Sequence, residues 1–370
     1  MKKATVVICL LCLLISLAVP VRAAALLGDA DGDGVLSPED ARVTLRVSVG
    51  LDDPGANADR MDVDGDGRVT AEDARLILRR YVGLESAFPV DGPPPAPKED
   101  VQIPASTPAP RALLYRAEGN RLLYKKNIDE RTAPASLIKL LTALTALKYC
   151  APSQPCIVGN EIDMIAWDSS VCPLQKGWRL SLEQLMHGML LPSGNDAAYC
   201  VAANVGRVVA GAGSPQLAVS YFKVMMNEMA KELGMKDTYV TTPDGYDAIG
   251  QFTTTRDLLT LARAALKNEV ITAICAKPSV TFTMSDGAVV TWRSTNRFLN
   301  PADSLYDARA YGLKGGFTDD AGCCLIAAFE QGGRHYIVIV MGADSYTKRY
   351  EWAASLLNAA VANQSRIPLN

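Results

Sequence analysis

From residue 111 onward, the spacing of apolar residues alternates between strand-like and helix-like segments. Apolar runs at 112–115 and 121–125 flank one turn, and runs at 324–330 and 335–341 flank another. This arrangement predicts two β-hairpins. Helical spacing fills much of the intervening sequence and returns over residues 347–362. The pattern therefore predicts one sheet built from both ends of this region, with helices inserted between them.

The first 110 residues follow a different pattern. Residues 1–23 combine two lysines, an apolar run and Val21-Arg22-Ala23, which predicts a secretory signal peptide. Residues 87–110 are rich in proline and poor in apolar residues, which predicts an extended, semi-rigid linker. The sequence therefore divides into a signal peptide (1–23), a small module (24–86), a linker (87–110) and a large domain (111–370).

Charge and cysteine content restrict the partners of the mature protein. Beyond residue 23 the chain has 34 basic and 40 acidic residues, and this mild acidity argues against nucleic acid as a partner. We also expect no membrane anchor, because no lipid-attachment cysteine follows the apolar run and the chain ends soon after the predicted terminal helix.

Seven cysteines remain after signal cleavage, so at least one thiol is unpaired. Cys150 and Cys156 are spaced for a small disulfide loop, with fully reduced cysteines as the alternative.

An internal repeat dominates residues 28–84. The segment 28–51 recurs as 61–84, and the two 24-residue copies agree at 14 positions. Each copy has carboxylates at positions 1, 3, 5 and 12 of a loop, a glycine at position 6 and a hydroxyl at position 9. With a backbone carbonyl at position 7, this is the ligand spacing typical of calcium. The predicted ligands of two calcium ions are Asp29, Asp31, Asp33, Val35, Ser37 and Asp40, and Asp62, Asp64, Asp66, Arg68, Thr70 and Asp73.

Each loop is followed by one predicted helix that ends near Gly50 or Gly83, and the first loop has no room for a helix before it. This duplication resembles a type I dockerin, the module that docks onto cohesin domains of a scaffold protein. The resemblance implies a small all-α module that binds calcium and a cohesin partner. Helix arginines then line the cohesin-facing surface or are simply solvated: Arg42, Arg46, Arg75, Arg79 and Arg80.

Ser136 and Lys139 lie at the start of an apolar stretch, which predicts a buried helix with both side chains on one face. A serine nucleophile needs a base, and Lys139 can serve when burial and nearby positive charge lower its pKa. His187 lies in an apolar helical stretch and His335 beside a turn, so neither suits a Ser-His-Asp triad. A zinc peptidase is disfavoured because the sequence lacks an HExxH motif.

Two later segments supply groups that a serine–lysine pair needs. Ser193 and Asn195 fall in a loop between two helical segments, where a hydroxyl and a carboxamide can meet the pair. Lys314 and the two glycines after it lie on a predicted edge strand. There a substrate backbone can approach closely and a cation can bind a carboxylate.

The ordered motifs SxxK, SxN and K-x-G resemble those of the penicillin-recognising serine acyl-enzymes. The surrounding sequence, including Thr242-Pro243-Asp244-Gly245, resembles the low-molecular-weight D-alanyl-D-alanine carboxypeptidases of peptidase family S11 over about 110–370. The resemblance implies an α/β sandwich of the β-lactamase/transpeptidase type, in which helices and a helical subdomain flank an antiparallel sheet.

The resemblance also implies a role for each motif residue. Ser136 becomes acylated with Lys139 as the base, while Ser193 relays a proton to the leaving D-alanine. Asn195 bonds Lys139 and the substrate backbone, and Lys314 attracts the terminal carboxylate. The implied substrate-binding segment is Lys314, Gly315, Gly316 and Phe317, with the backbone N–H groups of Ser136 and Phe317 as the oxyanion hole.

The implied protein is an exported serine-type D-Ala-D-Ala carboxypeptidase that trims peptidoglycan stem peptides at the cell wall. It needs no cofactor for catalysis, and β-lactams are its expected inhibitors. Similar enzymes carry Thr or Ser where this chain has Gly315, so we expect weaker substrate and β-lactam binding. Two alternatives are a weakly active or non-catalytic subunit that binds cell-wall peptide, and a serine β-lactamase. The second requires a deacylating glutamate that residues 228–232 do not supply.

Overall fold

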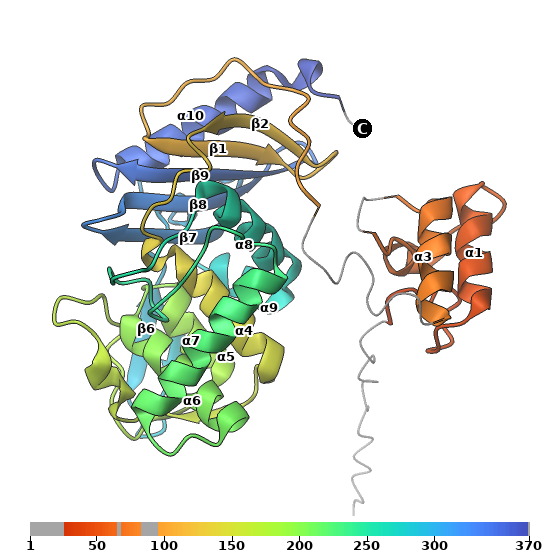
Figure 1. Ribbon diagram of the computed structural model, residues 1–370. Helices are drawn as coiled ribbons and strands as arrows, with labels where there is room; N and C mark the ends of the chain where they lie inside the picture. Colours follow the sequence, from red (N-terminus) through yellow and green to blue (C-terminus); the bar gives the residue numbers. More distant parts are fainter. Residues whose placement is uncertain (1–25, 65–67, 83–94, 369–370) are drawn as a thin grey trace, which may run out of the picture. The chain divides into compact units, whose positions relative to one another are not determined.

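The computed structural model of the protein describes residues 26–64, 68–82 and 95–368, which form an amino-terminal and a carboxy-terminal unit (Figure 1). The predicted signal peptide, the predicted ligand Asp66 and part of the predicted linker lie outside the described residues. Across the described ranges, no helix combines the length and the apolar content of a membrane span. Each unit buries its own set of apolar side chains.

The amino-terminal unit contains two helices, α1 (Pro38–Ser48) and α3 (Ala71–Tyr81), which lie side by side (Figure 1). Each begins after a capping residue, Ser37 or Thr70, whose side chain accepts a backbone N–H of the first turn. A short helical segment that the sequence did not predict precedes the second loop: η1 (Gly55–Asn57) and α2 (Ala58–Met61). The repeated sequence therefore forms a repeated loop-and-helix structure.

The carboxy-terminal unit is built on a five-stranded antiparallel sheet with the strand order β2-β1-β9-β8-β7 (Figure 1). Its strands are β1 (Arg111–Arg116), β2 (Arg121–Lys126), β7 (Ala310–Thr318), β8 (Gly322–Glu330) and β9 (His335–Ala343). Both predicted hairpins are present, as β1–β2 and β8–β9. Strand β1 pairs with β9, so the sheet joins the two ends of this unit, as the sequence predicted.

Side chains on alternate faces of the sheet enter two hydrophobic cores. On one face, Leu114 of β1 packs with Leu356 of α10 (Lys348–Ala362). On the other face, Leu113 belongs to the larger core that the inserted helices supply. Those helices are α4 (Lys139–Tyr149), α5 (Leu182–Leu190), α6 (Asn195–Ala210), α7 (Pro215–Glu232), α8 (Thr255–Lys267) and α9 (Glu269–Cys275).

Short elements complete the helical region and the carboxy terminus. Two small antiparallel sheets pair β3 with β4 and β5 with β6. The elements are β3 (Pro155–Ile157), β4 (Arg179–Ser181), β5 (Ser279–Thr283), β6 (Val289–Arg293), η4 (Asn160–Met164), η5 (Arg297–Leu299) and η6 (Gln364–Arg366). The whole is the predicted architecture of an antiparallel sheet between helices.

The described part of the predicted linker, residues 95–110, is not a free tether. Lys98 N donates to Asn120 O at 2.7 Å, and Leu122 N donates to Lys98 O at 2.9 Å. Further along, Ile103 N donates to Leu123 O at 3.0 Å, and the Ile103 side chain is buried. The prediction is wrong for this stretch, because residues 95–110 bond to the outer edge of β2 and add apolar side chains to the core.

All seven cysteines in the described residues are buried, unpaired thiols. The disulfide considered between Cys150 and Cys156 is therefore not formed in this structure. Burial raises the pKa of both thiols, to about 12 for Cys156, which disfavours the reactive thiolate.

Candidate active site

Ser136 lies in a short 3-10 helix, η3 (Ala135–Ile138), that runs directly into α4. The sequence predicted one helix from about Ser136, whereas the α-helix begins at Lys139. The turn still brings the two side chains together, because Lys139 Nζ lies 2.7 Å from Ser136 Oγ. Ser136 is half-buried and Lys139 is fully buried, so the hydroxyl is accessible while the amine is shielded from water.

Two glycines from distant segments pack against the turn that carries Ser136. Ala135 has a φ of 49°, in the left-handed region that is unfavourable for alanine. A Cβ atom on Gly245 would lie 1.9 Å from the carbonyl oxygen of Ala135. A Cβ atom on Gly316 of β7 would lie 2.9 Å from the backbone nitrogen of Ser136. Neither position accepts a side chain without displacing this turn.

Ser193 and Asn195 come from the connection between α5 and α6, and Asn195 is the first residue of α6. Lys139 Nζ donates to Asn195 Oδ1 at 2.6 Å and lies 3.3 Å from Ser193 Oγ. Ser193 adopts a φ of 68°, which again is unusual for a residue other than glycine. The structure therefore gathers the hydroxyls of Ser136 and Ser193 and the amide of Asn195 around one amine.

The start of α6 also holds one wall of the site. Asn195 donates from Nδ2 to Ser169 Oγ at 2.9 Å and from its backbone N–H to Ser170 O at 2.7 Å. The buried carboxylate of Asp196 accepts the backbone N–H groups of Cys172 and Leu174. Because these bonds fix residues 169–174, the orientation of Asn195 and the shape of the wall depend on each other.

Burial lowers the pKa of Lys139 from 10.5 to about 8, because desolvation disfavours the ammonium form. The carboxylates of Asp244 and Asp196 oppose this shift by stabilising the charged form. The sequence analysis expected nearby positive charge to contribute as well, but the repulsion between Lys139 and Lys314 instead lowers the pKa of Lys314. A minority of Lys139 side chains is therefore neutral at pH 7 and able to accept a proton.

Strand β7 forms the edge of the sheet beside Ser136 and carries the Lys314 segment. Lys314 is buried, and its Nζ donates to Gly315 O at 2.9 Å. Burial lowers the pKa of Lys314 well below its usual value, and the positive charges of Lys139 and Arg349 lower it further. The next three residues line the pocket: Gly315, Gly316 and Phe317.

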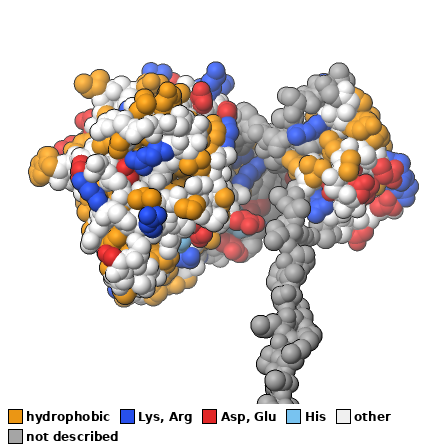
Figure 2. All heavy atoms as spheres, turned by 90° about the horizontal axis from the view of Figure 1, so that it is seen from below, with side chains coloured by type: hydrophobic (Ala, Val, Ile, Leu, Met, Phe, Trp, Pro, Cys, Tyr) orange, Lys and Arg blue, Asp and Glu red, His pale blue; other side chains and the backbone are white. Residues whose placement is uncertain are grey.

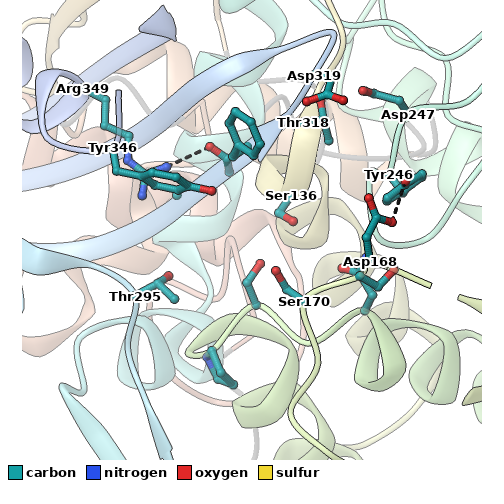
Figure 3. Close-up of a pocket in the computed structure, with 17 residues that line it drawn as sticks. Ser136, Asp168, Ser170, Tyr246, Asp247, Thr295, Thr318, Asp319, Tyr346 and Arg349 are labelled. Carbon is teal, nitrogen blue, oxygen red and sulfur yellow. Dashed lines mark hydrogen bonds between the residues drawn. The ribbon is translucent and has the colours of Figure 1, made fainter. Parts of the chain in front are cut away.

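Arg349, in the first turn of α10, is a pocket residue that the sequence analysis missed (Figure 3). It is only 4% exposed, and its Nη1 donates to Gly316 O at 2.8 Å and to Cys324 O at 3.1 Å. Its buried Nε has no hydrogen-bond partner among the described residues. A Cβ atom on Gly315 would lie 3.2–3.4 Å from the guanidinium, so the glycine leaves room for Arg349.

A cavity of about 320 Å³ is lined by Ser136, Ser193, Asn195, Arg349 and residues 315–317, among others. In Figure 3, Ser136 lies near the middle, Arg349 and Tyr346 lie on one side, and Asp168 and Tyr246 lie on the other. Buried polar side chains around an accessible hydroxyl form a pocket suited to a polar ligand. Its chemistry is that of a serine nucleophile with an amine base in reach.

Neither histidine takes part in this pocket. His187 is buried, and its Nδ1 lies 2.9 Å from Glu183 O, within the same helix. His335 is exposed and contacts the carboxylate of Glu118. Both positions agree with the expectation that no Ser-His-Asp triad forms here.

The two repeated loops of the amino-terminal unit gather carboxylates in the same way. Ligand oxygens of Asp29, Asp31 and Asp40 lie within 4.8 Å of one another, and so do those of Asp62, Asp64 and Asp73. In each loop the last aspartate accepts three backbone N–H groups at equivalent positions. The donors are Ala30, Asp31 and Ser37 for Asp40, and Val63, Asp64 and Thr70 for Asp73.

The remaining predicted calcium ligands are not part of these two carboxylate clusters. Asp33 Oδ1 accepts the N–H of Val35, and the hydroxyls of Ser37 and Thr70 cap the two helices. Arg68 is described, whereas Asp66 is not. Ion pairs of the helix arginines include Arg42–Glu39, Arg46–Asp52 and Arg75–Glu72.

Comparison with known proteins finds relatives of the carboxy-terminal unit. The sequence profile of Peptidase S11, D-alanyl-D-alanine carboxypeptidase, matches residues 98–345. DacD, a D-alanyl-D-alanine carboxypeptidase of Salmonella typhimurium, is 33% identical over 264 residues, which are 67% of this chain and 62% of DacD. This chain therefore spans less than two thirds of that relative.

Solved structures show the same fold. The Streptomyces K15 DD-transpeptidase is 26% identical with a TM-score of 0.64, covering 70% of this chain and all of that one. Penicillin-binding protein D2 of Listeria monocytogenes, solved in its ampicillin-bound form, is 28% identical with a TM-score of 0.55, covering 68% of this chain and 97% of that one. With the family profile spanning the residues around Lys139 and the edge strand, the chain belongs to the D-alanyl-D-alanine carboxypeptidase family, peptidase S11.

Proposed function

We propose that the carboxy-terminal unit is a serine-type D-Ala-D-Ala carboxypeptidase that removes the terminal D-alanine of peptidoglycan stem peptides. The supporting observation is the 2.7 Å contact between the buried amine of Lys139 and the accessible hydroxyl of Ser136. The same geometry suits one nucleophile and one base that work without a metal or other cofactor.

In the proposed reaction, Ser136 Oγ attacks the carbonyl carbon of the penultimate D-alanine while neutral Lys139 takes the hydroxyl proton. The negative oxygen that forms faces the backbone N–H groups of Ser136 and Phe317. The peptide C–N bond then breaks, and the leaving amine receives a proton from Ser193, which Lys139 reprotonates. Water cleaves the remaining ester with Lys139 again as base, which restores Ser136.

The leaving D-alanine has a free carboxylate, and the cationic end of the pocket is the proposed place for it. Arg349 supplies the positive charge there: its guanidinium lies beside Gly315, and its Nε has no hydrogen-bond partner among the described residues. Threonine at 315 restores a hydroxyl but brings its Cβ against the guanidinium. We therefore expect Gly315→Thr to change the rate of penicillin acylation by less than about fivefold, since the hydroxyl gain and the crowding oppose each other. A gain above tenfold would show that the hydroxyl is the group the pocket lacks.

A fluorescent penicillin tests the proposal, supported by the ampicillin-bound form of the Listeria relative. We expect stable labelling of the full chain, mapped to the peptide that contains Ser136, and none of Ser136→Ala. We also expect the wild type to release D-alanine from a stem peptide. Labelling without release favours the weakly active peptide-binding subunit, and rapid turnover of the penicillin favours a β-lactamase.

We further propose that the amino-terminal unit binds two calcium ions and docks onto a cohesin domain, after export directed by residues 1–23. The three converging carboxylates of each loop support this, because calcium prefers such oxygen ligands. Exposed apolar side chains on and after the two helices suit a docking surface, and Figure 2 shows hydrophobic side chains beside acidic ones on this unit. These side chains are Leu45, Val49, Leu51, Leu78, Tyr81 and Val82.

Calorimetric titration of the chelator-treated full chain with calcium tests the ion sites, and the expected stoichiometry is two. Cohesin capture in calcium, but not in chelator, is expected for both wild type and Ser136→Ala, because the serine belongs to the other unit. Calcium-independent capture, or none, contradicts the docking proposal. Export predicts a secreted protein whose amino terminus lies near residue 24.

A further inference from the structure

The end of the pocket opposite Arg349 is lined by three carboxylates, which we call the acidic wall: Asp168, Asp247 and Asp319 (Figure 3). They come from three separate segments of the fold. Asp168 belongs to the connection between η4 and β4, Asp247 to that between α7 and α8, and Asp319 to the turn between β7 and β8. Convergence of three segments on one pocket makes the acidic wall part of the site that contains Ser136.

Hydrogen bonds join the three segments but do not neutralise their charge. Tyr246 OH donates to Asp168 Oδ1 at 2.8 Å, and the backbone N–H of Asp320 donates to Asp247 Oδ2 at 3.0 Å. The second oxygen of Asp247 is buried without a hydrogen-bond partner in the described chain. No lysine, arginine or histidine among the described residues forms an ion pair with any of the three carboxylates.

The opposite end of the pocket provides an independent sign that the pocket can bind a ligand. Arg349 is more than nine-tenths buried and lines the cavity, and its Nε has no hydrogen-bond partner in the part of the chain that the structure describes. A buried, incompletely bonded guanidinium points to an anion as its missing partner. The pocket thus has a cationic end and an acidic end with Ser136 between them, and a matching ligand has opposite charges in the same order.

The spread of the carboxylates indicates which cation fits. In the described residues, the acidic groups with ligand atoms within 4.8 Å of one another are the two loops of the amino-terminal unit, and the acidic wall is not among them. A metal ion needs such close ligands. An ammonium group on a flexible side chain does not need such close ligands, because it is attracted electrostatically by several carboxylates that lie further apart.

We infer that the acidic wall selects peptides whose residue immediately before D-Ala-D-Ala carries a free side-chain amine. This inference rests on the proposed carboxypeptidase function, which directs the terminal carboxylate to Arg349 and the preceding residues to the other end. The nearby charges also raise the pKa of Tyr246, chiefly through its hydrogen bond to Asp168, so this phenol stays a neutral donor. A stem whose amine has been acylated in a cross-link loses the attraction, so the enzyme favours uncross-linked stems.

Two synthetic peptides test the inference on the full chain: Nα-acetyl-L-Lys-D-Ala-D-Ala and its Nε-acetylated form. The measurement is the ratio of kcat/KM for D-alanine release from the two. We expect wild type to favour the free amine by roughly tenfold at low ionic strength, falling towards one in about 0.5 M salt as the charges are screened. In the combined variant Asp168→Asn, Asp247→Asn and Asp319→Asn, the ratio falls to about one. Asparagine keeps the acceptors for Tyr246 and Asp320, so the change removes charge and preserves the bonds.

Asp320→Asn is the matched control, since it removes one charge from the same turn at a residue that does not line the pocket; most of the preference is retained. A wild-type ratio near one, or the same ratio in the combined variant, overturns the inference while leaving carboxypeptidase activity intact. Loss of the preference on adding calcium assigns the acidic wall to a metal and also overturns it. Failure to release D-alanine from either peptide overturns the proposed function itself.

Discussion

In the amino-terminal unit, the oxygens of Asp29, Asp31 and Asp40 meet within one loop, and the same pattern recurs 33 residues later. In the carboxy-terminal unit, the groups that contact Lys139 Nζ come from Ser136 and from residues 193 and 195 before and at the start of α6. Residues of β7 and α10 complete the pocket beside them. A site of the first kind depends on its own loop, whereas a site of the second kind depends on the whole fold. Substitutions that disturb one loop alone, or the packing between distant segments, therefore distinguish the two kinds of site.

Lys139→Met is expected to have the largest effect, because Ser136, Ser193 and Asn195 all contact this amine. We expect the rate of penicillin acylation to fall by about a thousandfold or more, the usual contribution of a general base. The fold is retained, since methionine fills a similar volume and removes a charge that is costly to bury. Stopped-flow acylation and a thermal melt measure both effects. A loss below tenfold would mean that another group takes the proton.

Gly245→Ala tests whether a residue remote from Ser136 in sequence supports the site. The new Cβ would meet the Ala135 carbonyl at 1.9 Å and displace the turn. We expect about a hundredfold slower acylation and a loss of roughly 2–4 kcal/mol in unfolding free energy.

Gly250→Ala is the matched control for that variant. Gly250 also has a positive φ, of 80°, but no atom lies within 4 Å of its added Cβ. It therefore carries the backbone strain of about 1 kcal/mol without the collision. Equal acylation rates in the two variants would show that strain, and not packing against Ala135, limits the site.

Asp40→Ala tests the local site in the amino-terminal unit. It removes the acceptor of three backbone N–H groups, from Ala30, Asp31 and Ser37. We expect amide hydrogen exchange over residues 28–48 to accelerate roughly 10- to 100-fold. Exchange in the carboxy-terminal unit stays the same if the loop is self-contained. Asp53→Ala, which removes one exposed acceptor for Gly55, serves as control, and acceleration beyond this unit would refute the local view.

The smallest effect concerns pH. With a pKa of about 8, Lys139 is mostly protonated at pH 7 and mostly neutral at pH 9. Since the neutral amine is the proposed base, acylation by penicillin is expected to rise about tenfold across this range, with its midpoint near pH 8. A rate that is flat or falls as pH rises would assign the base to another group. The midpoint of the profile thereby measures how far burial in the assembled site lowers the pKa of Lys139.

The strands and the motif residues were predictable because each is recognised from a short stretch of neighbouring residues. Alternating or continuous apolar runs between turns located both hairpins, and short motifs identified Ser136, Ser193 and Lys314. The resemblance implied that these motifs meet in one site, since spacing alone does not specify which loops converge. The structure then supplied the distances.

Other features depend on tertiary contacts that leave no local pattern. Arg349 lies in the first turn of α10, where no motif marks it. Its position beside Gly315 results from the packing of α10 on the sheet. Residues 95–110 have the composition of a linker, yet their backbone pairs with β2: Lys98 O accepts from Leu122 N, and Ile103 N donates to Leu123 O. The segment 55–61 is too short for helical periodicity to be visible.

The pairing of β1 with β9 has a consequence for how the protein matures. Arg111 on β1 lies opposite Met341 on β9, so the centre of the sheet closes only when nearly the entire chain has been made. Contacts between such distant positions form slowly, because the long intervening loop must first be closed. A nascent or clipped chain that ends before β9 contains Ser136, Ser193 and Lys314 but lacks Tyr346 and Arg349, so its pocket lining is incomplete.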